Sequence, residues 1–199
     1  MSDSIKVIII LGLGEKAFLW RSFVNKLNSI ENTSAEIYTF GWIEKDKNFN
    51  LLFEKFVNYL KEQKSLHEKI HLIGLSAGGS VAVLAKIKYP SLISSSINIC
   101  GRLLKGENVH PSLEIAAKNY PIFRTSVLEC EKQLKNTKSS LKDSILSLVP
   151  LFDETVPIET MSRSNQISFI KSPTITHVFS IWLITKIRFS KILKFIRKN

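Results

Sequence analysis

Short apolar runs alternate along the chain with stretches in which apolar residues recur at helical spacing. The runs that resemble strands are Lys6–Leu11, Glu36–Phe40, Lys69–Leu75, Leu92–Cys100, Ser144–Leu151 and Gln166–Ile175. The first is a continuous series of mainly β-branched residues, which is typical of a strand covered on both faces. The last run is the weakest signal of the six.

Helical spacing lies between most of these runs. The helical segments are Glu15–Ile30, the stripe of Leu51, Leu52, Phe56, Val57 and Leu60, the segment Ala77–Tyr89, and the end of the chain from about Val178. Pro90 stops the third of them, because proline cannot donate the next helical hydrogen bond. Alternating strands and helices predict an α/β fold, with a mostly parallel sheet of about six strands and helices on both faces.

The segment 102–141 does not fit this alternation. It is helical and polar, Pro111 and Pro121 interrupt it, and it is too long for a simple connection. We expect it to form a short helical cap or lid within a single domain that spans residues 1–199.

Composition narrows the class of protein. Hydrophobic residues make up 44% of the chain, which is ordinary for a globular protein and argues against disorder. No run of about 18 uncharged apolar residues occurs, so we expect no membrane-spanning helix. The apolar run near the start is shorter than the core of a secretory signal and lacks a small-residue cleavage site. We therefore expect a cytoplasmic protein.

The two cysteines, Cys100 and Cys130, are far apart in sequence. A cytoplasmic setting favours two free thiols over a disulfide. We interpret Cys100 as a core residue and not as a nucleophile. Cysteine and histidine do not recur at the paired spacing of a zinc site, so no metal is predicted.

The net charge of +11 is concentrated near the end of the chain, where no acidic residue follows Glu159. The basic residues there are Lys186, Arg188, Lys191, Lys194, Arg197 and Lys198. They alternate with apolar residues, which is compatible with a helix on an anionic membrane surface or with a final helix packed on the sheet. We favour packing and keep peripheral membrane contact as a hypothesis. No nucleic-acid partner is expected, since the charge is local and no binding motif accompanies it.

The segment Gly74-Leu75-Ser76-Ala77-Gly78 has the form G-x-S-x-G, between a predicted strand and a predicted helix. That context is the one a nucleophile elbow requires, because a sharp turn then exposes the serine at the carboxyl edge of the sheet. The turn also directs the backbone N–H of Ala77, at the helix start, toward a developing oxyanion. We interpret Ser76 as the nucleophile; a chance match in a glycine-containing loop is the alternative.

A serine hydroxyl needs a base, and the chain has four histidines. His71 lies five residues before Ser76 on the same predicted strand, so it is about 16 Å away at about 3.3 Å per residue. His67 is farther still, and His110 falls in the predicted cap. His177 follows the last predicted strand and therefore emerges at the same sheet edge as Ser76. We assign it as the general base, with a structural histidine as the alternative.

The base needs a carboxylate that orients the imidazole. Asp143 precedes a predicted strand and lies at the wrong edge, whereas Asp153 follows that strand and lies at the edge of Ser76 and His177. We assign Asp153, with Glu154 as a weaker substitute. The alternative is that Asp153 only begins a turn.

These motifs together resemble the α/β-hydrolase superfamily over nearly the whole chain. The resemblance rests on G-L-S-A-G, on D-E-T-V-P, which is similar to the family's acid loop, and on T-H-V-F around the histidine. It implies attack by Ser76 on the carbonyl of an ester or thioester with a small or medium acyl group. His177 acts as base and then acid, through an acyl-enzyme, without a metal or organic cofactor.

The oxyanion loop departs from the family pattern. The family's first strand usually ends in His-Gly, but here the sequence is Leu11-Gly12-Leu13-Gly14. Because the donor is a backbone N–H, we assign Leu13 and Ala77 as the oxyanion donors. We assign Gly12, Leu75 and Arg102 to substrate binding. Arg102 is placed to meet an acidic substrate group, or else it is a solvated arginine at a loop entrance.

Two other functions stay open at this stage. The basic, apolar end of the chain would suit a lysophospholipase or acyl-thioesterase that works at a membrane surface. A non-catalytic binding protein on a hydrolase scaffold is the other alternative, although a binding module has no need for an elbow, an acid loop and a histidine loop in register.

Overall fold

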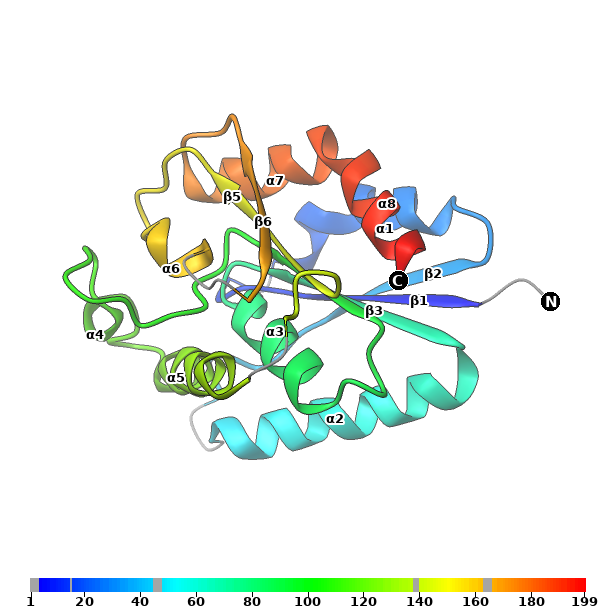
Figure 1. Ribbon diagram of the computed structural model, residues 1–199, viewed down its shortest axis with the longest axis horizontal. Helices are drawn as coiled ribbons and strands as arrows, with labels where there is room; N and C mark the ends of the chain where they lie inside the picture. The colour runs from blue at the N-terminus through cyan, green and yellow to red at the C-terminus, as the bar shows by residue number, and fades with distance from the viewer. Residues whose placement is uncertain (1–3, 15, 45–47, 138–139, 163–165) are drawn as a thin grey trace.

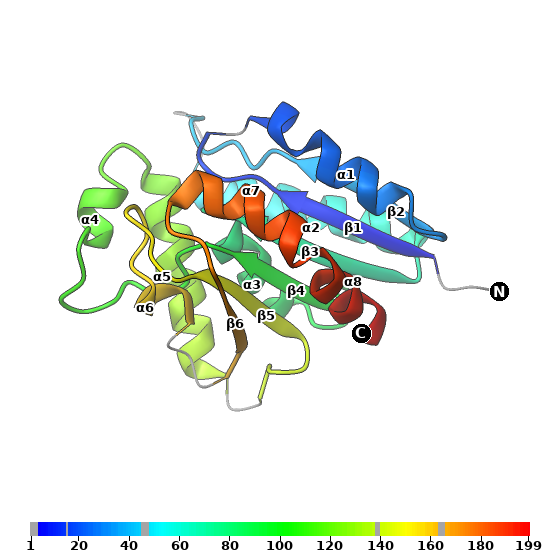
Figure 2. The same ribbon diagram turned by 90° about the horizontal axis from the view of Figure 1, so that it is seen from above.

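The computed structural model describes residues 4–14, 16–44, 48–137, 140–162 and 166–199. Within these residues the strands form one parallel sheet of six, in the order β2-β1-β3-β4-β5-β6. The strands are β1 Ile5–Ile10, β2 Thr33–Tyr38, β3 Lys69–Leu75, β4 Ser95–Ile99, β5 Ile145–Pro150 and β6 Ser168–Ser172. The predicted α/β fold with a parallel sheet is confirmed (Figures 1 and 2).

Helices cover both faces of this sheet. They are the 3-10 helix η1 Ala17–Trp20, then α1 Arg21–Asn28, α2 Phe49–Leu66, α3 Gly78–Lys88, α4 Leu113–Ala116, α5 Pro121–Asn136, α6 Glu159–Ser162, α7 His177–Ile187 and α8 Phe189–Lys198. In Figure 1 the sheet is seen nearly edge-on, with α1, α7 and α8 on one side and α2, α3 and α5 on the other. Figure 2 shows the first of these layers from above.

The alternation of side chains along β1 explains the two layers. Val7 and Ile9 belong to the apolar cluster under α1, α7 and α8, whereas Ile8 and Ile10 belong to the cluster under α2, α3 and α5. All four are fully buried. A continuous apolar run is therefore what a strand needs when both of its faces are covered.

The strand order brings the candidate residues to the carboxyl edge of the sheet. The chain begins in the interior of the sheet at β1, adds β2 on one side, and then crosses to β3 on the other. Ligands of open parallel sheets bind outside the carboxyl ends of the strands near such a reversal. Ser76 follows β3, Asp153 follows β5 and His177 follows β6, so all three lie at this carboxyl edge.

Several element boundaries differ from the predicted ones; strands β4 and β6, for example, are shorter at both ends than the runs that predicted them. Strand β2 begins at Thr33 and not at Glu36, because its early residues pair with Ile5 and Lys6 although they are polar. The final helix is divided into α7 and α8 at Arg188, whose guanidinium donates to the Lys171 carbonyl and the Ser172 hydroxyl. The predicted start of the first helix, Glu15, lies outside the described residues.

The segment predicted as a cap contains two different parts. Helix α5 packs on the sheet beside α3, and it buries Phe123, Val127 and Cys130 in the cluster of that face. It is thus the crossover helix between β4 and β5. The loop before it, together with α4, projects at the carboxyl edge, at the left of Figure 1.

The basic end of the chain packs on the sheet. Helix α8 buries Phe189, Ile192 and Ile196 in the cluster under α1 and α7, while its lysines are exposed. Its apolar stripe is therefore used by the core, as the packing interpretation predicts. Among the described residues, no helix combines the length and the hydrophobicity needed to traverse a lipid bilayer.

Candidate active site

The serine lies in a strained turn between β3 and α3. Its φ is +51°, in the left-handed region that side chains other than glycine rarely adopt. Two contacts hold the turn: the Ser76 N–H donates to the Ile99 carbonyl at 3.0 Å, and its own carbonyl accepts from Gly79 at 2.9 Å. Gly78 is required because a Cβ there would collide with the carbonyl of Ile10 on β1. The strand, turn and helix have the geometry expected of a nucleophile elbow.

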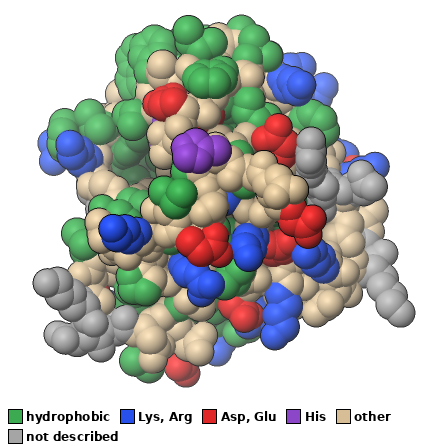
Figure 3. Space-filling model, turned by 90° about the vertical axis from the view of Figure 1, so that its left-hand side faces the viewer, with side chains coloured by type: hydrophobic (Ala, Val, Ile, Leu, Met, Phe, Trp, Pro, Cys, Tyr) green, Lys and Arg blue, Asp and Glu red, His purple; other side chains and the backbone are tan. Residues whose placement is uncertain are grey.

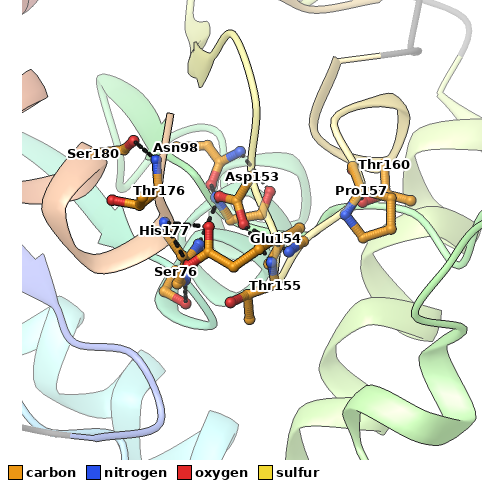
Figure 4. Close-up of polar contacts among 12 residues, drawn as sticks. Ser76, Asn98, Asp153, Glu154, Thr155, Pro157, Thr160, Thr176, His177 and Ser180 are labelled. Atoms are coloured by element: carbon orange, nitrogen blue, oxygen red, sulfur yellow. Dashed lines mark hydrogen bonds and ion pairs between the residues drawn. The ribbon is translucent and has the colours of Figure 1, made fainter. Parts of the chain in front are cut away.

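The structure brings the three predicted catalytic side chains together (Figure 4). The Ser76 Oγ lies 2.7 Å from Nε2 of His177, and Nδ1 of His177 lies 2.7 Å from Oδ2 of Asp153. A neutral imidazole that donates from Nδ1 to the carboxylate leaves Nε2 free to accept the hydroxyl proton. The arrangement can therefore take a proton from Ser76 and stabilise the charge that forms on the ring.

Asp153 is held by its own turn. Its Oδ1 accepts from the backbone N–H groups of Thr155 at 2.9 Å and Val156 at 2.8 Å, which leaves Oδ2 to the imidazole. The side chain is fully buried. A carboxylate fixed by two backbone donors has one orientation, so it also fixes the orientation of the ring that it contacts.

Glu154 has a role that sequence reasoning did not find. It was considered only as a substitute for Asp153, but both of its carboxylate oxygens lie 3.0 Å from the backbone N of His177, the first residue of α7. The Thr176 N–H, one residue earlier, donates to Ser180 at 3.2 Å. An acidic side chain at a helix N-terminus satisfies unpaired N–H groups and the helix dipole. The adjacent acids Asp153 and Glu154 were the one feature of the sequence that could have indicated this contact.

The predicted oxyanion donors lie beside the serine. A Cβ added to Gly12 would lie 2.8 Å from the Ser76 Cβ and 3.4 Å from the Ala77 nitrogen, so the loop after β1 runs directly past the elbow. Leu13, the next residue, is half-buried against the core. The Trp42 indole donates to the Leu11 carbonyl at 2.9 Å and holds this loop where the family's histidine is missing.

A buried amide supports the elbow from below. Asn98 on β4 donates to the Gly101 carbonyl and to the Ser147 hydroxyl, both at 2.9 Å, and accepts from the Gly101 N–H at 3.0 Å. Ser147 in turn donates to the carbonyl of Met161. These bonds tie the ends of β4 and β5 together below the catalytic residues, which stabilises the relative positions of the elbow and the acid loop.

Two residues predicted to bind substrate face the protein interior. Arg102 is 1% exposed, and its guanidinium donates to the carbonyls of Leu104, Lys105 and Pro111. It therefore shapes the loop before α4, and the structure does not bring it to Ser76. Leu75 is 1% exposed and packs in the core below α7.

The remaining polar candidates lie elsewhere or are inert. Cys100 is buried and free, and burial together with the charge of Asp153 raises its pKa well above the usual value for a thiol. His71 is fully buried, and Asp143 is exposed beside Lys198. Among the described residues, no group of three histidine, cysteine, aspartate or glutamate side chains could hold a metal ion.

Known proteins resemble both the sequence and the fold. The family model described as "BAAT / Acyl-CoA thioester hydrolase C terminal" matches residues 51–162, more than half of the chain. The match includes Ser76 and Asp153 and ends before His177. No curated protein matches the sequence.

Solved structures extend the likeness to the whole chain. A structure from a study of LipS and LipT, two metagenome-derived lipolytic enzymes, has a TM-score of 0.79 at 14% identity and covers 99% of this chain and 95% of its own. Est1E from Butyrivibrio proteoclasticus has a TM-score of 0.70 at 16% identity, with coverages of 99% and 90%. The type II thioesterase BorB from the borrelidin biosynthetic cluster has a TM-score of 0.65 at 13% identity, with coverages of 99% and 94%. At these identities the comparison shows a common α/β-hydrolase fold.

Proposed function

The chain belongs to the BAAT / acyl-CoA thioester hydrolase C-terminal family, and on that premise we propose that it is a serine hydrolase that cleaves a carboxylic ester or thioester. The observation that carries the proposal is the unbroken line of hydrogen bonds from Ser76 through His177 to Asp153. This line stands at the carboxyl edge of the sheet and at the N-terminus of α3, where an anion is stabilised.

The first step forms an acyl-enzyme. The Ser76 Oγ attacks the carbonyl carbon of the substrate while His177 Nε2 takes its proton, so the ring becomes an imidazolium. Asp153 stabilises that charge through Nδ1. His177 then gives the proton to the departing alcohol or thiol, and the acyl group stays on Ser76.

The second step releases the acyl group. A water molecule enters in place of the leaving group, His177 takes its proton, and hydroxide attacks the ester of Ser76. The acid leaves and the serine regains its proton. The balance of both steps needs only water, so the proposal includes no cofactor.

Negative charge on the substrate oxygen is stabilised by backbone donors. We assign this role to the N–H groups of Ala77 and Leu13, because Ala77 directly follows the nucleophile and the loop of Gly12 runs beside it. Each such donor contributes about 10²- to 10³-fold to the rate of acyl transfer. Gly12 allows this close approach, since a side chain there would collide with the elbow.

Two of the solved neighbours are named as lipolytic enzymes and as a type II thioesterase, which supports an ester or thioester as substrate. A lipid-directed activity is the second candidate, because several large apolar side chains are exposed around His177. A non-catalytic role is disfavoured because a protein that only binds has no need for a serine, an imidazole and a buried carboxylate joined by hydrogen bonds in this order.

A fluorophosphonate probe tests the proposal. Wild type should be labelled covalently, whereas Ser76→Ala and His177→Ala should not. Ser95→Ala is the matched control, because Ser95 also contacts a histidine but lies within the sheet, and it should be labelled like wild type. A folded wild type that stays unlabelled would exclude the proposed chemistry. A panel of p-nitrophenyl esters of rising chain length then defines the acyl group.

A further inference from the structure

Large apolar side chains are exposed around the catalytic histidine. We call them the apolar rim: Phe18, Leu19, Leu151, Phe152, Ile175, Val178, Phe179 and Trp182. Each is between 38% and 64% exposed. Figure 3 views the carboxyl edge of the sheet: hydrophobic side chains gather over its upper part, with acidic and basic side chains beside them, and charged side chains of both signs are more crowded over the middle and lower parts.

Three segments far apart in sequence bring the rim together. Leu19 of η1 and Trp182 of α7 line one small recess, and the ring of Phe179 stacks on Trp182 at 5.7 Å. The backbone N–H groups of Leu151 and Phe152 both donate to the carbonyl of Thr174, next to Ile175. His177 stands in the sequence between Ile175 and Val178, so members of the rim directly flank the base of the proposed reaction along the chain.

The hydrophobic core does not use these exposed residues. Helix α7 buries Ile181 and Ile184 against the sheet, and on its outer side it presents Val178, Phe179 and Trp182 to solvent. A helix that is apolar on both sides is normally covered on both sides. Large exposed apolar patches on a globular protein usually mark an interaction surface.

Basic side chains lie beside the rim on its α1 and α7 side. The Lys186 ammonium lies 3.8 Å from the centre of the Trp182 ring, and the exposed Lys26 lines the same recess as Leu19. No acidic residue follows Glu159. The one exposed acid of the acid loop, Glu154, accepts from the backbone N–H of His177 and borders the rim on the side of Phe152.

The other half of the same edge is different. A recess of about 1060 Å³ lies between the loop before α4 and α5, and acidic and basic side chains both line it, with the pairs Lys135–Glu131 and Lys105–Glu114 among them. Acidic and basic groups are thus mixed in that recess, whereas basic and apolar side chains lie together beside Trp182. This combination is complementary to a surface that is apolar inside and anionic outside.

We propose that the apolar rim docks on an anionic lipid surface, so that an acyl ester or thioester held in that surface reaches Ser76 directly. The aromatic residues enter the boundary between headgroups and acyl chains, and Lys26 and Lys186 contact anionic headgroups. A second copy of the chain is a poorer occupant, because it would bring two further lysines, and no additional anionic group, to the basic side of the rim. The part of the inference that concerns substrate rests on the proposed hydrolase function; the docking does not.

Vesicle co-sedimentation tests the docking. Wild type should bind vesicles of equimolar phosphatidylcholine and phosphatidylglycerol, and bind vesicles of phosphatidylcholine alone much less. Phe179→Asp should weaken binding by about tenfold or more, since it replaces an inserted aromatic by a charge. Lys186→Glu should weaken it by about tenfold at low salt and less at high salt.

The controls carry the same chemical changes to the opposite face of the sheet. Leu66→Asp and Lys61→Glu alter exposed residues of α2, and both should bind like wild type. Equal losses in the control variants, or wild-type binding by Phe179→Asp, would overturn the docking surface. A loss of dimer mass by light scattering in Phe179→Asp, without any vesicle binding by wild type, would assign the rim to a second copy and overturn the inference.

A soluble p-nitrophenyl ester separates this inference from the proposed function. If wild type hydrolyses the soluble ester but never binds vesicles, docking fails and the hydrolase proposal stands. If wild type binds anionic vesicles through the rim but hydrolyses no ester, docking stands and the hydrolase proposal fails. If both hold, hydrolysis of an ester embedded in anionic vesicles should fall in Lys186→Glu while its turnover of the soluble ester is retained.

Discussion

Two serine–histidine pairs in this molecule have nearly equal hydrogen bonds in opposite surroundings. Ser76 lies 2.7 Å from His177 at the carboxyl edge of the sheet, and Ser95 lies 2.8 Å from His71 inside it, where the two are cross-strand neighbours on β3 and β4. The ring of His177 is also bonded to Asp153, whereas the second nitrogen of His71 has no partner. The same pair of residue types thus occurs with and without a carboxylate.

The comparison separates contact from function. Burial and three neighbouring lysines lower the pKa of His71 to about 4, so its ring stays neutral and its hydrogen bond serves the packing of two strands. His177 has a carboxylate for its positive form and a serine held in a strained turn. A base for catalysis must be able to accept a proton and hold it, and only the pair at the edge has what this requires.

Removing each histidine gives the largest expected contrast. His177→Ala should lower kcat on a p-nitrophenyl ester by about 10⁴- to 10⁶-fold, because the serine then has no base. His71→Leu should leave kcat unchanged, since His71 lies within the sheet. Steady-state kinetics on both variants, with circular dichroism to verify folding, measures the contrast. A large loss of kcat in a folded His71→Leu would contradict the division between the two pairs.

Asp153→Asn tests what the carboxylate adds to the edge pair. The amide can still accept from Thr155 and Val156 through one oxygen, but it offers an N–H where His177 needs an acceptor. We expect kcat to fall by about 10⁴-fold while the protein stays folded. Retention of near-normal kcat would show that the imidazole is oriented without Asp153.

The inner pair should be visible in stability and not in rate. The unfolded His71 takes a proton near pH 6.5, and the folded one only near pH 4. Its contribution to the free energy of unfolding is therefore fully present above about pH 6.5 and is lost as the pH falls to about 4, by up to about 3 kcal/mol. Urea unfolding at neutral and acidic pH should show a smaller acid loss in His71→Leu than in wild type.

His110→Gln is the control for this stability experiment, because His110 is exposed. It should leave the acid loss as in wild type. Identical acid losses in wild type and His71→Leu would contradict the assignment of this loss to His71.

Glu154 should give the smallest effect. It binds the backbone N–H of His177 and so acts as a positioning residue for the edge pair. Glu154→Ala should lower kcat by about tenfold with KM unchanged, a size typical of one hydrogen bond to a charged group. Glu154→Gln keeps an acceptor oxygen and should restore most of kcat. Equal losses in both variants, or a change in KM alone, would argue against positioning.

The fold was predictable from the sequence where a strand is covered by helices on both faces. The runs at β1, β3 and β5 are mostly apolar along their length because helices cover both faces of the sheet, and their short length between turn signals marks them as strands. The polar start of β2 and the division at Arg188 were not predictable, because both depend on pairing with residues distant in sequence. The crossover role of α5 was hidden for the same reason.

The candidate site, too, was predictable from the sequence only in part. Sequence order and strand direction sufficed to bring Ser76, Asp153 and His177 to one edge, since parallel strands all end there. The side-chain direction of Arg102 was not accessible, because its three carbonyl partners become neighbours only when the loop closes around it. The bond from Trp42 to Leu11 likewise joins segments that no local pattern relates.

The edge strand β6 affects how the site should respond to heat. Among the described residues it pairs with β5 alone, and two of its five residues are exposed, yet the segment that follows it supplies His177. Local unfolding of β6 would displace the imidazole while β1, β3 and β4 remain paired. On heating, we therefore expect catalytic activity to be lost at a lower temperature than the far-ultraviolet circular dichroism signal. A covalent cross-link between β5 and β6 should reduce the difference between these two temperatures.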